Sequence, residues 1–175
     1  ERLDTLGDRR PGVGLVSADR RSLAENEMRL WGDKPEHEGL PDIVWLKVGG
    51  GKTKIEGETF AVRPFYIAKY PVTYTQFQAF IDALDGFTNP RWWQSLAAND
   101  DHKLRPAEQY FKFGNHPRES VSWYDAIAFC RWLNARLGWT DIPARLTLKT
   151  LGAYTGLRLL TEWEWQWAAT GGRPG

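Results

Sequence analysis

The chain has 175 residues, enough for one domain of ordinary size, and its 42% hydrophobic content includes 10 tryptophans. Its 23 Lys and Arg against 22 Asp and Glu leave a net charge of +1, which provides no long-range attraction to nucleic acid or to an anionic membrane. A membrane-spanning helix needs about 18 or more consecutive apolar residues, and the sequence contains no such run.

Cysteine and histidine are scarce in this chain. Cys130 is the one cysteine, which excludes an intrachain disulfide and a CxxC metal or redox motif. The three histidines are far apart, and none has the spacing HxxxH or HExxH. We therefore expect no catalytic residue, no metal site and no cofactor within these residues. With no leader segment visible and no disulfide, we expect a cytoplasmic or otherwise intracellular protein, with surface display left open.

Residues 1–40 are expected to form an N-terminal arm. Charges are dense in this stretch and apolar residues are sparse. Ser22 and Glu25 have the spacing of a capping box, and apolar residues follow at helical spacing up to Trp31. The arm is therefore predicted to contain one short helix, which packs on the main domain through Leu30 and Trp31.

The main domain is expected to occupy residues 41–175 and to open with strands. Ile43–Val48 is rich in β-branched and aromatic residues, which is typical of a strand. For Gly49–Gly51 we predict a hairpin turn. The alternative, a phosphate-binding loop, fits poorly because more strand follows it instead of a helix. Lys54–Phe60 and Arg63–Tyr70 predict two further strands.

Three helices are predicted from capping boxes, in which a Ser or Thr is followed three positions later by an acidic residue or Gln. They are expected to begin after Thr73, Ser122 and Thr161, and each continues with apolar residues at helical spacing. The last helix follows a strand-like run at Leu157–Leu160, ends at Gly171-Gly172 and is expected to anchor a core through its tryptophans. The side chains expected in the core are Phe77, Phe80, Trp123, Ile127, Cys130, Trp132, Trp163 and Trp167.

Cys130 lies on the apolar stripe of the second predicted helix, where a cysteine behaves as a small buried hydrophobe. The alternative, a reactive nucleophile, needs an electropositive and partly exposed setting, and only the neighbouring Arg131 supplies charge. We expect packing and not catalysis at this position.

Two stretches lack periodicity. Phe87–Asn115 is expected to be a long irregular loop, and Trp139–Gly156 an insertion before the last helix. Long loops of compact domains are often functional, and aromatic side chains in them either bind a ligand or pack in the core. The candidate ligand-binding residues are Trp92, Trp93, Tyr110 and Trp139.

Three ordered blocks, Phe65–Phe77, His116–Leu133 and Arg158–Gly172, are similar to motifs of the formylglycine-generating-enzyme (sulfatase-modifying factor) superfamily. Leu160 departs from the motif, because the family usually has Pro there. The resemblance implies an α+β, C-type-lectin-like fold: two main helices packed on a small twisted antiparallel sheet, with long irregular loops. Residues 41–175 then correspond to the N-terminal portion of such a domain, truncated at its C-terminal end.

The resemblance leaves several functions open, because function depends on sites grafted onto the fold. In the copper-dependent oxidases of the superfamily, the active cysteine pair follows the last block. The iron-dependent sulfoxide synthases use an HxxxHxE motif that is absent here. In target proteins of diversity-generating retroelements, the fold displays a variable ligand-binding surface near its C-terminus.

The leading hypothesis is a non-catalytic ligand-binding or display module, one form of which is a retroelement target protein with its variable surface after residue 175. The alternative is a formylglycine-generating oxidoreductase with its catalytic cysteines after residue 175, and a third is a purely structural half-domain. Copper or calcium enters only if a C-terminal half supplies the ligands. The expected partner is a protein or a small molecule, and neither nucleic acid nor a membrane span is expected.

Overall fold

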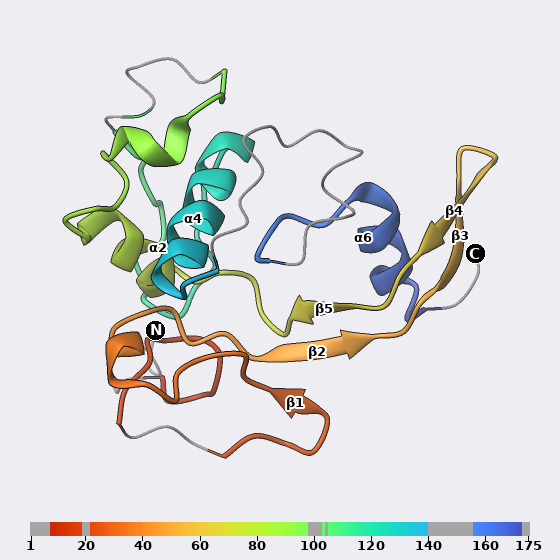
Figure 1. Cartoon of the computed structure of the whole chain (residues 1–175), viewed down its shortest axis with the longest axis horizontal. Helices are drawn as coiled ribbons and strands as arrows, with labels where there is room; N and C mark the ends of the chain where they lie inside the picture. The colour runs from red at the N-terminus through yellow and green to blue at the C-terminus, as the bar shows by residue number, and fades with distance from the viewer. Residues whose placement is uncertain (1–7, 19–21, 98–102, 104, 140–155, 173–175) are drawn as a thin grey trace.

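The computed structural model describes residues 8–18, 22–97, 103, 105–139 and 156–172 (Figure 1). They form a mixed α/β structure with small antiparallel sheets. None of the helices in these ranges is long and apolar enough to cross a membrane. In chain order the elements are β1 (Glu27–Met28), η1 (Pro35–His37), β2 (Trp45–Val48), β3 (Gly51–Ile55), β4 (Glu58–Val62), β5 (Phe65–Ala68), α2 (Tyr74–Asp82), η2 (Pro90–Trp93), α4 (Trp123–Arg136) and α6 (Glu162–Ala169).

The main sheet has the strand order β1-β2-β5, and all its pairs are antiparallel. Leu46 of β2 lies between Glu27 of β1 and Ile67 of β5. Side chains alternate between the two faces of a sheet, and Trp45 and Ala68, which pair with each other, pack against the core. Leu46 and Ile67 therefore lie on the opposite, apolar face, which the core does not cover.

The triple glycine joins two sheets, so the predicted hairpin turn at Gly49–Gly51 is wrong. β2 pairs with β5, whereas β3 pairs with β4 in a separate two-stranded sheet. A Cβ on Gly51 would lie 2.2 Å from a ring carbon of Trp167, and a Cβ on Gly50 would lie 2.9 Å from the carbonyl oxygen of Val62. Close packing therefore excludes larger residues at both glycines.

The tight turn of this region lies at Glu56-Gly57, within the stretch predicted as one strand. Both residues have positive φ, 51° and 89°, as a two-residue type I′ hairpin requires. Ile55 and Glu58 pair on either side of it. The sequence prediction fails here because the turn lacks the Asn or Asp that usually precedes glycine in such hairpins.

Two predicted capping boxes are confirmed at the starts of α2 and α4. The Thr73 hydroxyl accepts a hydrogen bond from the Gln76 N–H, and the Gln76 side chain accepts one from the Thr73 N–H. Ser122 and Asp125 form the same reciprocal pair before α4. Because these contacts satisfy amide groups that the helix leaves unpaired, they fix where each helix begins.

The core is aromatic and lies between α2, α4 and η2. Phe80 is fully buried and contacts Phe77, Phe87, Phe129 and Trp132 at ring-centroid distances between 5.3 and 6.0 Å. Edge-to-face and tilted ring pairs of this kind stabilise a core beyond the apolar area that they bury. The packing of α2 against α4 therefore depends on these rings.

The segment expected to be an arm contributes to the same core. Val13 and Val16 are 3% and 5% exposed. The buried amide of Gln76 donates hydrogen bonds to the carbonyl oxygens of Gly12, Gly14 and Asp42. These contacts attach residues 12–16 to α2, and the domain boundary after residue 40 stays a prediction.

The helix predicted between Ser22 and Trp31 is not formed. Glu27–Met28 instead form β1 after a turn in which the Glu27 N–H donates to the Ala24 carbonyl. Pairing of this short segment with β2 overrides its helical spacing. Of the two side chains expected to pack on the domain, Trp31 is 3% exposed and Leu30 is 40% exposed.

The run Leu157–Leu160 is not a strand. The side-chain amide of Asn134 on α4 holds it by donating to the Leu157 carbonyl at 2.8 Å and accepting from the Leu157 N–H at 2.9 Å. The predicted insertion at Trp139–Gly156 lies outside the described residues except at its two ends.

In the predicted irregular loop at Phe87–Asn115, the short helix η2 forms, and Asn89 caps it by accepting from the Arg91 N–H. Residues 98–102 and 104 of this loop lie outside the described ranges. The coarse prediction of helices on small antiparallel sheets is confirmed, while the C-type-lectin-like assignment stays a prediction.

Candidate functional site

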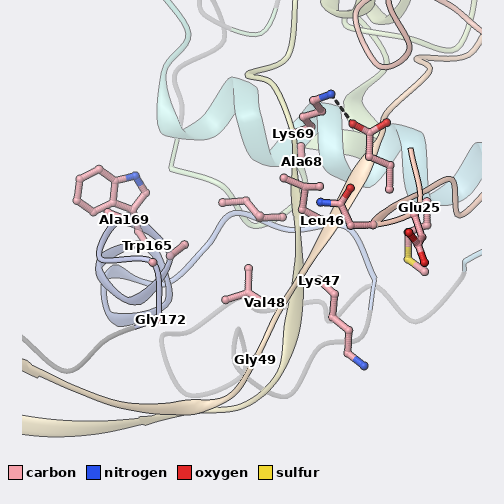
Figure 2. Close-up of a pocket in the computed structure, with 16 residues that line it drawn as sticks. Glu25, Leu46, Lys47, Val48, Gly49, Ala68, Lys69, Trp165, Ala169 and Gly172 are labelled. Carbon is pink, nitrogen blue, oxygen red and sulfur yellow. Dashed lines mark hydrogen bonds and ion pairs between the residues drawn. The ribbon is translucent and has the colours of Figure 1, made fainter. Parts of the chain in front are cut away.

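A groove of about 860 Å³ opens on the apolar face of the main sheet (Figure 2). Its floor includes Leu46 and Val48 of β2 and Ile67 of β5. The turn before β1 forms one wall, and α6 with the residues that follow it forms another. This α6 groove is lined by residues 25–28, 46–49, 67–69, 165, 168–169 and 171–172.

The third predicted capping box is confirmed and fixes the start of α6. The Thr161 N–H donates to the Glu164 carboxylate at 2.9 Å, and the Thr161 hydroxyl accepts from the Glu164 N–H at 3.3 Å. Arg158 binds the same carboxylate through two hydrogen bonds of 2.6 Å. Burial by itself raises the pKa of Glu164, but the hydrogen bonds from Arg158 and Thr161 outweigh it and hold the pKa below its ordinary value.

The three tryptophans of α6 have different surroundings. Trp163 stacks on Phe60 of β4, with ring centroids 5.1 Å apart. Trp167 is 5% exposed and donates its indole N–H to the Gly49 carbonyl at 2.7 Å. These two side chains attach α6 to the β3–β4 hairpin. Trp165 is 61% exposed and lines the α6 groove, and its indole projects from the helix in Figure 2.

An ion pair lies at the rim of the α6 groove, on the opposite side from Trp165 in the view of Figure 2. The ammonium of Lys69 binds the carboxylate of Glu27, so β1 and the end of β5 are linked across β2. The hydrogen bond from Lys69 lowers the pKa of Glu27, and the same bond raises the pKa of Lys69. The rim therefore carries charge while the floor is apolar.

Trp92 and Trp93, expected to bind a ligand, are buried. Each is 2% exposed. Their indole N–H groups donate to the carbonyl oxygens of Asp85 and Phe87. Because both rings satisfy their one polar group inside the protein, they pack in the core.

The other two candidates differ from each other. Trp139 is partly buried against the core and lies edge-on to Trp31, with centroids 5.8 Å apart. Tyr110 is 83% exposed and packs edge-to-face on Phe111. The Glu119 carboxylate accepts hydrogen bonds from the backbone N–H groups of Tyr110 and Phe111, which holds this loop tip. None of the four candidates lines the α6 groove, and ligand contact by any of them stays a prediction.

Two of the side chains expected in the core lie elsewhere. Trp123 is 52% exposed at the start of α4, whereas the next residue, Tyr124, packs against the core. Trp163 is partly buried, and its ring contacts the hairpin and not the main core. Cys130 is partly buried against the core. The remaining five are at most 5% exposed: Phe77, Phe80, Ile127, Trp132 and Trp167.

Cys130 and the histidine and acidic side chains are the residue types that could hold copper or calcium. Burial raises the pKa of the Cys130 thiol to about 12, so at neutral pH it is protonated and is neither a nucleophile nor a thiolate ligand for copper. In the described ranges, no three His, Cys, Asp or Glu side chains lie close enough to hold a metal ion. The expected absence of copper and calcium from these residues stays a prediction.

Trp165 and the groove were not predicted, although the sequence contains one signal for the exposure of Trp165. Trp163, Trp165 and Trp167 alternate along a helix, and residues two apart are separated by about 200° around its axis. All three therefore cannot share one face. If Trp163 and Trp167 face a packing partner, Trp165 faces away from that partner.

A comparison with protein families matches residues 32–175 to the sulfatase-modifying factor enzyme 1-like domain. The chain is 32% identical to the formylglycine-generating enzyme of Mus musculus over 82 residues, which cover 46% of this chain and 16% of the mouse protein. It is 27% identical to the formylglycine-generating enzyme of Streptomyces coelicolor over 161 residues, which cover 71% of this chain and 41% of that protein.

The chain thus spans less than half the length of these relatives. No solved structure matches it. The family match covers most of the chain and includes α2, α4 and α6. The chain therefore belongs to the sulfatase-modifying factor enzyme 1-like family.

Proposed function

We propose that this chain is a non-catalytic ligand-binding module and that the α6 groove binds its ligand. One observation carries the proposal: Trp165, a large aromatic side chain that is 61% exposed, lines the groove. Exposed tryptophans at concave sites are typical anchors of binding interfaces. The volume, about 860 Å³, lies within the range of ligand sites.

A polypeptide segment is the proposed ligand. The family takes its name from an enzyme that modifies a sulfatase, which is itself a protein. The apolar floor at Leu46, Val48 and Ile67 suits apolar side chains of an extended segment, and the charged pair Glu27–Lys69 suits its polar groups. Hydrophobic contact at the centre with polar contact at the rim is the usual anatomy of a protein interface.

Two finer forms of the proposal go further. The first is that the scaffold has the C-type-lectin-like fold, which the family resemblance supports. The second is that it displays a surface varied by a retroelement, with the variable positions after residue 175. Comparing coding sequences from several isolates tests the second form, because clustered variation there supports it and uniform sequence contradicts it.

Binding of peptides that tile a sulfatase sequence tests the groove. We expect some immobilised peptides to bind the chain, and Trp165→Ala to abolish that binding without loss of the fold. Trp123→Ala is the matched control, because Trp123 is also exposed, at 52%, but does not line the groove. Equal binding by the native chain and Trp165→Ala would contradict the proposal.

A formylglycine-generating oxidoreductase is the second candidate, favoured by the names of both curated relatives. Its catalytic cysteines would lie outside these residues, because the Cys130 thiol packs against the core and burial raises its pKa. Formylglycine carries an aldehyde, so the full-length protein can be incubated with a sulfatase and probed with a hydrazide reagent. Hydrazide labelling of the sulfatase that occurs only after this incubation supports the oxidoreductase function. A sulfatase that stays unlabelled contradicts it.

A further inference from the structure

The β3–β4 hairpin has two outer edges that differ in charge. It projects from the rest of the described structure (Figure 1) and has no third strand among the described residues. A sheet edge offers unpaired N–H and C=O groups that can pair with another strand. The two edges of this hairpin differ in whether they can accept such a strand.

The pairing register identifies the free backbone groups. Ile55 and Glu58 flank a two-residue turn, so they form a hydrogen-bonded pair, and Thr53 and Phe60 form the next one. The intervening residues direct their N–H and C=O groups outward. On β3 these residues are Lys52 and Lys54, and on β4 they are Thr59 and Ala61.

The β3 edge opposes pairing with its own copy. An antiparallel pair centred on Thr53 would place Lys52 opposite Lys54 of the second chain, and this would occur twice. Like charges directly opposite each other destabilise a strand pair, and lysines protect edge strands in this way. β3 is therefore protected against self-association.

The β4 edge is complementary to itself. An antiparallel pair centred on Phe60 places Thr59 opposite Ala61 of the second chain, and Ala61 opposite Thr59, without any like-charge contact. Both residues are exposed and uncharged. Their outward groups then form four hydrogen bonds, two in each narrow pair.

The packing of α6 leaves this edge accessible. The helix contacts β3 more extensively than β4, and it covers the face of the hairpin that carries Phe60. In the pair centred on Phe60, the two Phe60 rings are cross-strand neighbours, and aromatic cross-strand pairs stabilise a sheet. Each ring also keeps its stacking contact with Trp163 of its own chain.

We propose that the β4 edge binds the β4 edge of a second copy of this chain, giving a two-fold symmetric dimer with a continuous four-stranded antiparallel sheet. The contact is isologous, so it closes with two chains and does not propagate. Arranged in this way, the charged β3 edges become the outer edges of the dimer sheet.

The test is the oligomeric state of the 175-residue chain, measured by sedimentation velocity over a range of concentrations. The double variant Thr59→Glu/Ala61→Glu places glutamates opposite each other across the proposed interface. Within one chain the same glutamates face Lys54 and Lys52, so the hairpin itself is not disfavoured. We expect a concentration-dependent native dimer, weakened at least about tenfold in Kd by these changes, because each directly opposed like-charge pair is destabilising.

The double variant Thr88→Glu/Gln94→Glu is the control, because it adds the same charge at exposed positions away from the hairpin. It should dimerise as the native chain does. Ala61→Pro removes an outward N–H without adding charge and should also weaken the dimer. A native chain that stays monomeric at every concentration, or a dimer that forms equally well in the Thr59→Glu/Ala61→Glu variant, would overturn the proposal.

Discussion

The thiol of Cys130 is enclosed where α4 packs on the core, and burial raises its pKa from 9.0 to about 12. The folded chain therefore keeps this proton between pH 9 and 12 while the unfolded chain releases it. The free energy of unfolding should consequently fall with rising pH in this window, with a slope from this group of up to about 1.4 kcal/mol per pH unit. Below pH 9 the thiol is protonated in both the folded and the unfolded chain, so its full contribution to the free energy of unfolding is present there.

Cys130→Ala provides the matched control for this titration. The variant should cost about 1 kcal/mol at pH 7, as small core truncations do. Denaturant unfolding at pH 7–11 should give a shallower alkaline decline for the variant than for the native chain. Parallel curves for the two proteins would contradict the burial of this thiol.

Trp163 and Trp165 are neighbours on α6 with different expected effects. Trp163→Ala removes the stacking on Phe60 and should cost about 2–3 kcal/mol, less than a fully buried tryptophan would. Trp165→Ala should change stability by no more than about 0.5 kcal/mol, because the side chain is largely exposed.

Hydrogen exchange separates these effects by location. In Trp163→Ala, amides of α6 and the hairpin should exchange faster, while those of α2 and α4 keep their protection, because the main core does not include this ring. Simultaneous loss of protection in α2 would show that Trp163 supports the whole domain.

At the scale of elements, the contact between α6 and the hairpin depends on the absence of a side chain at position 51. Gly51→Ala should cost about 3 kcal/mol, because the new Cβ would lie 2.2 Å from the Trp167 ring. In the double variant Gly51→Ala/Trp167→Ala, the two losses should be clearly less than additive, since the clash is gone. Unfolding curves of the four proteins give this coupling, and strict additivity would contradict the clash.

The hairpin turn should be open to stabilisation. Glu56 adopts φ 51°, a left-handed conformation that is costly for most residues and that Asn tolerates better. Glu56→Asn should raise the free energy of unfolding by about 0.5–1 kcal/mol. The midpoint of thermal unfolding measures the gain, with Lys54→Asn, in the adjoining strand, as a control that should bring none.

At the scale of the whole molecule, residues 12–16 should be needed for folding. Val13 and Val16 are buried, and removing two such side chains costs roughly 4 kcal/mol in lost burial. A chain that begins at residue 18 should therefore unfold at a much lower temperature than the native chain. One that begins at Pro11 keeps these contacts and should lose far less; equal midpoints for the two truncations would contradict a structural role for this segment.

The features predicted correctly from the sequence depend on local chemistry. The boxes at Thr73, Ser122 and Thr161 involve residues three apart, so the sequence contains both partners of each contact. β1 was mispredicted because its structure depends on pairing with β2, many residues away. Non-local pairing of this kind overrides helical spacing.

The candidate site was beyond sequence reasoning for a related reason. The core covers one face of the main sheet, and the groove opens on the other face. No single stretch of sequence indicates which of the two faces the core leaves uncovered. Aromatic character alone did not separate Trp92, which packs inside, from Trp165, which lines the groove. Only the angle of about 200° around the helix axis between Trp165 and each of its two tryptophan neighbours indicates that Trp165 faces away from their packing partner.

The hydrogen bond from the Trp167 indole to the Gly49 carbonyl joins residues 118 positions apart. During synthesis at about 5–20 residues per second, the ribosome makes the hairpin roughly 6–24 s before it makes α6. For that interval the face of β4 that carries Phe60 has no tryptophan to cover it. The nascent chain therefore exposes an apolar strand surface until α6 emerges.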